Sequence, residues 1–221
     1  MRLFLGLSLA LLSARAETLD AVLARMDQAA PQFKSYSATM KRQEYTAVLN
    51  ETTVSKGSMR LKRAKTGMTG VIDFTEPDPM TVYLNGKTVQ RFFPKAHTVE
   101  IYDVGKYAHS IDEVILVGFG TSGADLKKQY DIKLGGSETV AGVTTSRLEL
   151  VPKDSETRKL VSKIEMWIPE GQANPIQEKL SPPSKDYSII NFSDVKINPT
   201  LPDSDYTLTL PAGVKKIYPQ K

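Results

Sequence analysis

Cysteine is absent from the 221 residues of this chain, and its absence narrows the chemistry open to the protein. Without cysteine the chain can form no disulfide bond, no thiolate metal site and no thiol nucleophile. It also lacks a cysteine that could carry a lipid anchor behind a leader sequence. Histidine occurs only twice, at His97 and His109, and the two stand at no spacing typical of metal ligands.

Motifs of common enzyme classes are missing as well. The sequence contains no HExxH, no GxSxG and no phosphate-binding glycine loop before a helix. Gly118, Gly120 and Gly123 have the spacing of GxGxxG, but no strand of a βαβ unit precedes them. We therefore expect no enzymatic activity, no cofactor and no metal. A lipid hydrolase is the alternative of a different class, and it would need a nucleophile–base pair that the sequence does not offer.

The chain has little excess of charge of one sign. Its formal net charge is +4, and it falls to +2 without Arg2 and Arg15. Such a balance argues against a nucleic-acid partner. With 40% hydrophobic and 24% charged residues and no repeat or linker, the sequence is typical of one folded domain.

Long apolar runs are confined to the N-terminus. Residues 3–12 are apolar, Met1-Arg2 forms a short positive head, and Ala14-Arg15-Ala16 has the pattern of a cleavage site. The run is too short to span a bilayer. We interpret residues 1–16 as a signal peptide and residues 17–221 as a single exported domain, which in a bacterium would be soluble in the periplasm.

Hydrophobic periodicity predicts one helix followed by many short strands. Leu19, Val22, Leu23 and Met26 have the spacing of an amphipathic helix over residues 18–30, which Pro31 ends. From residue 36 the period is two, and the predicted strands are 37–45, 53–63, 67–74, 80–84, 88–93, 98–104, 130–134, 144–151, 160–168, 176–180, 187–196 and 206–210. Their short connections indicate antiparallel pairing in a curved sheet or open barrel.

One segment interrupts the strands. Ser110 and Glu113 form a capping box, and Ile111, Val114, Ile115 and Phe119 follow at helical spacing. We predict a short helix over residues 111–118; a buried strand is the alternative, because valine and isoleucine are β-branched. A second short helix, capped by Ser122, is expected to extend to residue 129.

Arg63 departs from the alternation of its strand. Met59 and Leu61 alternate with Arg60 and Lys62, so Arg63 has the parity of the apolar residues. A guanidinium keeps its charge and is costly to bury without acceptors. Either the strand ends at Lys62 and Arg63 is solvated, or Arg63 reaches a specific partner across the apolar face.

The apolar faces of the strands offer more surface than one small helix can cover. By parity, the candidates for the inner face are Met59, Leu61, Met68, Ile72, Phe74, Met80, Val82, Leu84, Leu148, Leu150, Ile164, Met166, Ile168, Ile190 and Phe192. Methionine suits adaptable apolar surfaces. An ordinary packed core and an apolar cavity are both compatible with this pattern.

Several modest motifs, in this order, resemble a known family. They are Phe-Lys-Ser-Tyr-Ser-Ala at 33–38, Gly-Ser-Met-Arg-Leu-Lys-Arg at 57–63, Glu76-Pro77, Asn-Gly-Lys-Thr at 85–88, Leu-Glu-Leu-Val-Pro-Lys at 148–153, and the segment 192–214. The family is that of the periplasmic outer-membrane lipoprotein carriers (LolA type), and the resemblance covers nearly all of residues 17–221. The chain departs from it in three respects. Ala64 stands where the family usually has proline, the aromatic residue expected a few positions later is absent, with Met68 and Val71 near there, and residues 104–123 match only in apolar character.

This resemblance implies a fold of the α+β class, an unclosed antiparallel β-barrel (half-barrel) with an N-terminal helix and short lid helices over an apolar cavity. Ile111, Val114, Ile115 and Phe119 would form the lid. Arg63 would latch it through main-chain carbonyls near residue 111. The wall of the acyl-chain cavity would comprise Met59, Leu61, Met68, Ile72, Phe74, Met80, Val82, Leu84, Leu148, Leu150, Ile164 and Met166.

The resemblance also implies a function. The protein would bind lipoprotein acyl chains, as a monomer, and move them from the inner to the outer membrane. Its partners would be an inner-membrane lipoprotein-releasing ABC transporter and an outer-membrane lipoprotein receptor. The alternative on the same fold is a carrier or sensor of another envelope lipid or glycolipid.

The N-terminal segment gives a first testable prediction. We expect cleavage after Ala16 and a soluble mature chain that begins at Glu17, because the leader has the three regions of a secretory signal. N-terminal sequencing of protein from the periplasmic fraction checks this. An intact Met1 terminus, or protein embedded in the membrane, would contradict the interpretation.

Overall fold

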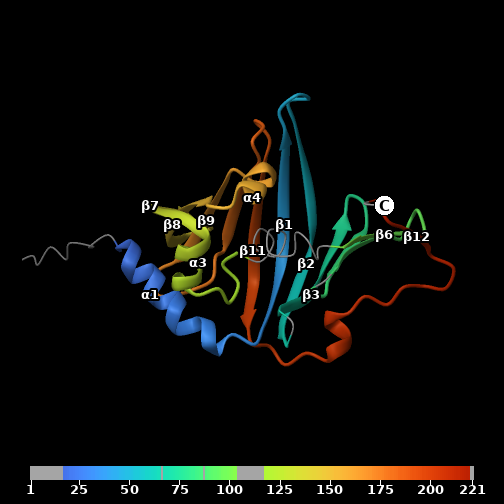
Figure 1. Ribbon diagram of the computed structural model, residues 1–221, viewed down its shortest axis with the longest axis horizontal. Coiled ribbons are helices and arrows are strands. Elements are labelled where there is room, and N and C mark those ends of the chain that lie inside the picture. The colour runs from blue at the N-terminus through green and yellow to red at the C-terminus, as the bar shows by residue number, and fades with distance from the viewer. Residues whose placement is uncertain (1–16, 66, 87, 104–116, 220–221) are drawn as a thin grey trace, which may run out of the picture.

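The computed structural model describes residues 17–65, 67–86, 88–103 and 117–219 (Figure 1). Within them the strands form one mixed, unclosed sheet of twelve strands in the order β12-β6-β5-β4-β3-β2-β1-β11-β10-β9-β8-β7. Their bounds are β1 Ser35–Thr46, β2 Glu51–Ala64, β3 Gly67–Glu76, β4 Met80–Leu84, β5 Thr88–Phe93, β6 Thr98–Asp103, β7 Tyr130–Val140, β8 Val143–Pro152, β9 Lys163–Pro169, β10 Gln177–Ser181, β11 Tyr187–Ile197 and β12 Lys215–Ile217. The predicted α+β half-barrel is confirmed, except that β12 pairs parallel with β6.

The described helices are short, and the three α-helices begin at side-chain caps. They are α1 (Leu19–Ala29), η1 (Ala30–Gln32), α3 (Gly123–Gln129), α4 (Ser155–Leu160) and η2 (Asp203–Tyr206). Thr18 caps α1, and Ser122 caps α3 by accepting a hydrogen bond from the Asp125 amide. Both expected helices are therefore confirmed in these segments.

One expected strand starts later than predicted, and another is wrong. The strand predicted at 160–168 begins only at Lys163, because Asp154 caps the helix α4 up to Leu160. The strand predicted at 206–210 does not form: Tyr206 ends η2, where its ring is 3% exposed and lies under the Lys62 ammonium at 5.7 Å. Contacts with the rest of the chain override the local alternation there.

One face of the sheet, here called the inner face, carries two apolar clusters. The helix cluster lies at the β7–β9 end, where α1 and α3 pack (Figure 1). Its buried members are Val22, Leu23, Met26, Val117, Leu126, Tyr130, Leu148, Leu150, Val161, Ile164, Met166 and Ile168. The barrel cluster lies further along the sheet, and its buried members are Phe33, Tyr36, Ala38, Met40, Met59, Leu61, Phe74, Leu84, Val89, Phe119 and Phe192.

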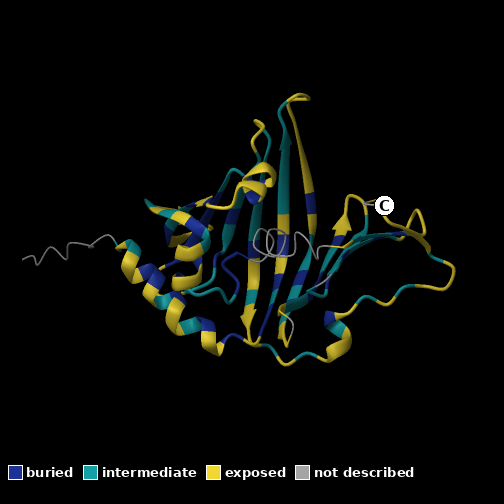
Figure 2. Ribbon diagram, viewed as in Figure 1, coloured by how far each residue is buried: buried dark blue, intermediate teal, exposed yellow. Residues whose placement is uncertain are grey.

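The helix α1 is amphipathic and covers only its own part of this face. Val22, Leu23 and Met26 are at most 2% exposed, whereas its outward side is exposed (Figure 2). Full burial of each such side chain contributes roughly 1.5–3 kcal/mol. This burial fixes the helix over β7–β9 and leaves the barrel cluster to other segments.

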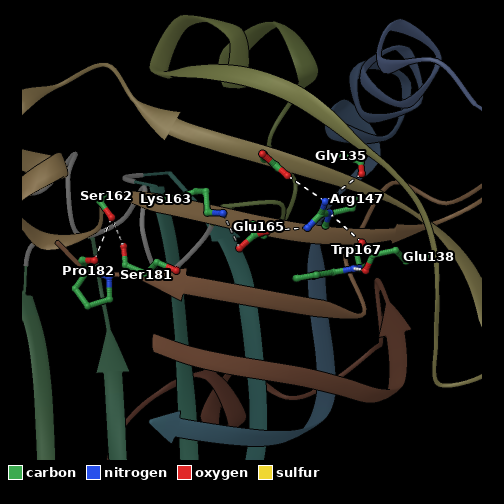
Figure 3. Close-up of polar contacts among 10 residues, drawn as sticks. Gly135, Glu138, Arg147, Ser162, Lys163, Glu165, Trp167, Ser181 and Pro182 are labelled. Carbon is green, nitrogen blue, oxygen red and sulfur yellow. Dashed lines mark hydrogen bonds and ion pairs between the residues drawn. The ribbon is translucent and has the colours of Figure 1, made fainter. Parts of the chain in front are cut away.

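The opposite face of β7–β9 carries a charged network (Figure 3). The guanidinium of Arg147 lies 3.1 Å from carboxylate oxygens of Glu138, Glu149 and Glu165, and it donates to the Gly135 carbonyl. The side chain of Glu165 is only 5% exposed, and Lys163 pairs with its second oxygen at 3.2 Å. A buried carboxylate is tolerated here because two cations compensate it.

This network predicts a large effect of one substitution. Arg147→Leu should lower the free energy of unfolding by roughly 3 kcal/mol, because it leaves the buried Glu165 with one partner fewer. Arg158→Leu in the exposed part of α4 is the matched control and should change stability by less than about 1 kcal/mol. Urea unfolding measures both, and equal losses would contradict the role given to Arg147.

Candidate functional site

A cavity of about 250 Å³ opens on the inner face, among strands from both halves of the sheet. The residues that line it are Met40, Arg42, Glu44, Met59, Ile72, Phe74, Val82, Phe119, Glu178, Leu180, Ser188, Ile190 and Phe192. They come from β1 to β4 and from β10 and β11, with Phe119 entering from a loop. The lining is apolar at one end and charged at the other.

The first eight residues expected on the cavity wall all belong to the barrel cluster or pack against it. Met59, Ile72, Phe74 and Val82 line the cavity itself. Leu61 and Leu84 are buried beside it, and Met68 and Met80 pack against the cluster while half-buried.

The other four residues expected on the wall lie elsewhere. Leu148, Leu150, Ile164 and Met166 are fully buried in the helix cluster beneath α1, and they do not line the described cavity. They share the inner face, as their parity predicts, but α1 and α3 cover that end of the sheet. Alternation identifies the face of a strand and does not reveal which helix packs on it.

Phe119, one of the four expected lid residues, closes the apolar end of the cavity. It is 2% exposed, and its ring lies 4.7 Å from that of Tyr36 and 5.2 Å from that of Phe192, both edge to face. Such aromatic pairs add to the stabilisation from burial. Ile111, Val114 and Ile115 lie outside the described residues.

The segment 117–120 crosses from one apolar cluster to the other. Val117 packs in the helix cluster, and Phe119 packs in the barrel cluster. Gly118, between these two residues, has a φ angle of +84°, and Gly120, directly after Phe119, has a φ angle of +67°. A Cβ atom on Gly120 would lie 2.6 Å from the Phe33 ring and 3.0 Å from Nη2 of Arg63, so the segment requires glycine for both reasons.

Arg63 reaches specific partners. β2 continues to Ala64, and the guanidinium donates to the carbonyls of Phe33 (Nε, 3.1 Å), Gly120 (Nη2, 2.9 Å) and Ala30 (Nη2, 3.3 Å). One side chain thus joins the end of β2 to the turn after α1 and to the loop that carries Phe119. The side chain is nevertheless exposed, so water competes for its hydrogen bonds.

The polar end of the cavity was not predicted from the sequence. It consists of Arg42, Glu44, Glu178 and Ser188, whose strands were correctly expected. The signal was present: Glu178 stands between Ile176 and Leu180 with inward parity, just as Arg63 does on its own strand. The Arg42 guanidinium pairs with Glu44 at 2.9 Å and lies 4.3 Å from the centre of the Phe74 ring.

Burial governs the ionisation of these groups. Glu178 is 2% exposed, and this burial raises the pKa of its carboxyl group well above the ordinary range. Burial also raises the pKa of the Tyr36 hydroxyl, and the charge of Glu178 adds to that rise. The pKa of Arg42 is lowered, mainly by burial.

The family follows from the sequence match. Residues 32–209 match the family described as outer membrane lipoprotein carrier protein LolA. The chain belongs to this LolA family. Comparison with curated proteins gives no match.

Solved structures of distant proteins share this fold. A conserved protein from Thermus thermophilus superposes with a TM-score of 0.54 at 10% identity, covering 91% of this chain and 99% of that one. MucB superposes with a TM-score of 0.52 at 14% identity, covering 86% of this chain and 62% of that one. A LolA superfamily protein from Nitrosomonas europaea matches at 15% identity, 87% and 99% coverage, and a TM-score of 0.42.

The family match identifies a lipoprotein- or lipid-binding carrier fold. None of the helices in the described ranges is both long and apolar enough to cross a bilayer. The recognisable chemistry of the site is an apolar cavity with a polar end, beside an arginine that binds three main-chain carbonyls.

The buried Glu178 makes stability depend on pH. Because its pKa is higher in the folded state, the native protein keeps this proton after the unfolded chain has lost it, above about pH 4.3. The cost of ionising Glu178 is therefore absent below that pH, and the free energy of unfolding declines as the pH rises toward the folded pKa.

Glu178→Gln tests this. Urea unfolding between about pH 4 and pH 7 should show wild type losing stability relative to the variant as the pH rises, by at most about 1.4 kcal/mol per pH unit. The amide cannot ionise, so the stability of the variant lacks this dependence on pH. Parallel profiles for the two proteins would mean that Glu178 titrates as it does in the unfolded chain.

Proposed function

We propose that this LolA-family protein is a periplasmic carrier that holds lipoprotein acyl chains in the cavity and moves them from the inner to the outer membrane. The observation that carries the proposal is the 250 Å³ cavity, walled by Met59, Ile72 and Phe74 and bordered by the loop that Arg63 binds. The protein is exported by its N-terminal segment, acts as a monomer, and meets a lipoprotein-releasing ABC transporter and an outer-membrane receptor.

The physical need for such a container is large. Each methylene exposed to water costs about 0.8 kcal/mol, so one long acyl chain costs on the order of 10 kcal/mol. An acylated protein therefore leaves a membrane slowly unless an apolar site accepts its chains. The inner face supplies that site at the part of the sheet that α1 leaves uncovered.

Release of the acyl chains requires that the cavity can also close. Arg63 binds the Gly120 carbonyl, next to Phe119 at the apolar end of the cavity. We infer that Phe119 moves with Ile111, Val114 and Ile115 as a lid, and that Arg63 latches it. Hydrogen bonds from an exposed guanidinium are individually weak, so the lid opens while the sheet stays folded.

Arg63→Leu is the decisive variant in a two-step assay. The first step measures loading of a lipoprotein from inner membranes, and the second measures its transfer to outer membranes. The variant should load like wild type but transfer at least about tenfold less, because closing the lid no longer favours release; a tenfold change corresponds to 1.4 kcal/mol. Arg63→Lys should be intermediate, since it keeps the charge and loses the planar fork.

Lys62→Leu is the matched control. Lys62 neighbours Arg63 but pairs with Asp203 near η2, and this variant should load and transfer normally. Transfer at the wild-type rate by Arg63→Leu would overturn the latch. Failure of the wild-type protein to load lipoprotein at all would overturn the carrier function.

A further inference from the structure

The polar residues of the cavity lie in adjacent rows across neighbouring strands. Ile190 of β11 is paired with Glu178 of β10 on one side and with Arg42 of β1 on the other. In the next row, Ser188 of β11 lies between Leu180 and Glu44. Adjacent strands are about 4.8 Å apart, so these side chains point into the same end of the cavity.

Several polar atoms of this group lack hydrogen-bond partners. In the described part of the chain, no partner contacts Oε1 of Glu178, Oγ of Ser188 or Nε of Arg42, and the nearby Tyr36 hydroxyl is also unpaired. More than nine in ten buried polar groups in proteins have a partner, and an unpaired one destabilises the fold. Several hydrogen-bond donors and acceptors without partners therefore lie together at the cavity.

Elsewhere in the described residues, comparable buried groups have partners. Glu165 on β9, which is nearly as deeply buried as Glu178, has Arg147 and Lys163 at 3.1 and 3.2 Å. The buried hydroxyl of Thr145 donates to the Glu138 carbonyl, and that of Ser146 donates to Glu17. The contrast points to a ligand as the missing partner in the cavity.

The unpaired atoms also restrict the chemistry of that ligand. A plain hydrocarbon would leave all of them unsatisfied, and a strongly ionic group finds little free charge, because Arg42 is already paired with Glu44. Nε of Arg42 only donates, whereas the Ser188 hydroxyl donates and accepts and Oε1 of Glu178 can accept. An uncharged group that both donates and accepts complements this set, as an amide or a hydroxyl does.

We propose that the cavity binds an uncharged amphiphile whose acyl chain lies along Met40, Met59, Phe119 and Phe192 and whose amide or hydroxyl group donates a hydrogen bond to Glu178. Arg42 and Ser188 hydrogen-bond to the oxygen of the same group. This assignment rests on the proposed carrier function and deepens it by naming the polar group beside the chain.

Two matched pairs of ligands test the donated hydrogen bond. Lauramide and N,N-dimethyllauramide share chain and carbonyl, but only lauramide can donate; lauryl alcohol and its methyl ether differ in the same way. Each ligand competes with the apolar fluorescent probe phenylnaphthylamine for the full mature chain. We expect the donor of each pair to displace the probe at roughly tenfold lower concentration, as one hydrogen bond to a buried group implies.

Glu178→Met should abolish this preference and keep the binding, because methionine retains the length and apolar stem of glutamate. The variant should be at least as stable as wild type toward urea, since it removes an unpaired buried carboxyl. If it does not fold, Glu178→Leu replaces it. Glu149→Leu, which removes a carboxylate from the other face of the sheet, is the matched control and should keep the preference.

The outcomes separate this inference from the carrier function. Equal displacement by both members of each pair in wild type, or a preference that survives in Glu178→Met, would overturn the role of Glu178 while leaving an acyl-chain carrier intact. If none of the four ligands displaces the probe, the carrier function itself fails. A preference in wild type and Glu149→Leu that disappears in Glu178→Met supports the proposal.

Discussion

The inner face of the sheet carries more apolar side chains than the helices packed on it can cover, and this imbalance determines the layout of the described molecule. α1 and α3 bury the β7–β9 end, where Leu148 and Ile164 are completely inaccessible to water. Over β1 to β4 no described helix takes their place, and the barrel cluster surrounds a cavity of about 250 Å³. An apolar concavity of this kind is the usual form of a lipid site, and here it follows from incomplete coverage of one continuous face.

A few contacts hold the segment that connects the helix-covered part of the inner face to the part that carries the cavity. The segment 117–120 spans both clusters, and its two positive-φ glycines let Phe119 reach the rings of Tyr36 and Phe192. Arg63 binds the Gly120 carbonyl from the side of β2. Aromatic packing therefore holds the loop on the cavity, while the arginine ties it to the sheet through hydrogen bonds that water can replace.

Much of the architecture was predictable because strands and helix caps produce recognisable patterns in the local sequence. Period-two alternation located most strands, Thr18 and Ser122 marked helix starts, and the parity of Arg63 indicated an unusual environment that three carbonyls now explain. What failed depends on distant contacts. Leu148 and Met166 have the inner-face parity, yet only the docking of α1 decides that they are core. Tyr206 alternates like a strand residue, but packing beside Lys62 places it in a 3-10 turn. The capping of α4 by Asp154 was visible in the sequence and was missed.

Glu178 and Arg63 are both polar residues at strand positions that face the apolar side of the sheet, but their environments differ. Arg63 stands at the end of β2, so its long side chain extends past the apolar face to backbone carbonyls while it remains exposed. Glu178 stands in the middle of the sheet between Met166 and Ile190, where no described main-chain group is free to meet its Oε1. A fold that only needed stability would place an apolar residue there, because an unpaired buried carboxyl weakens the empty protein. Keeping a carboxyl in such a place is consistent with a site whose polar requirement is met when the cavity is occupied.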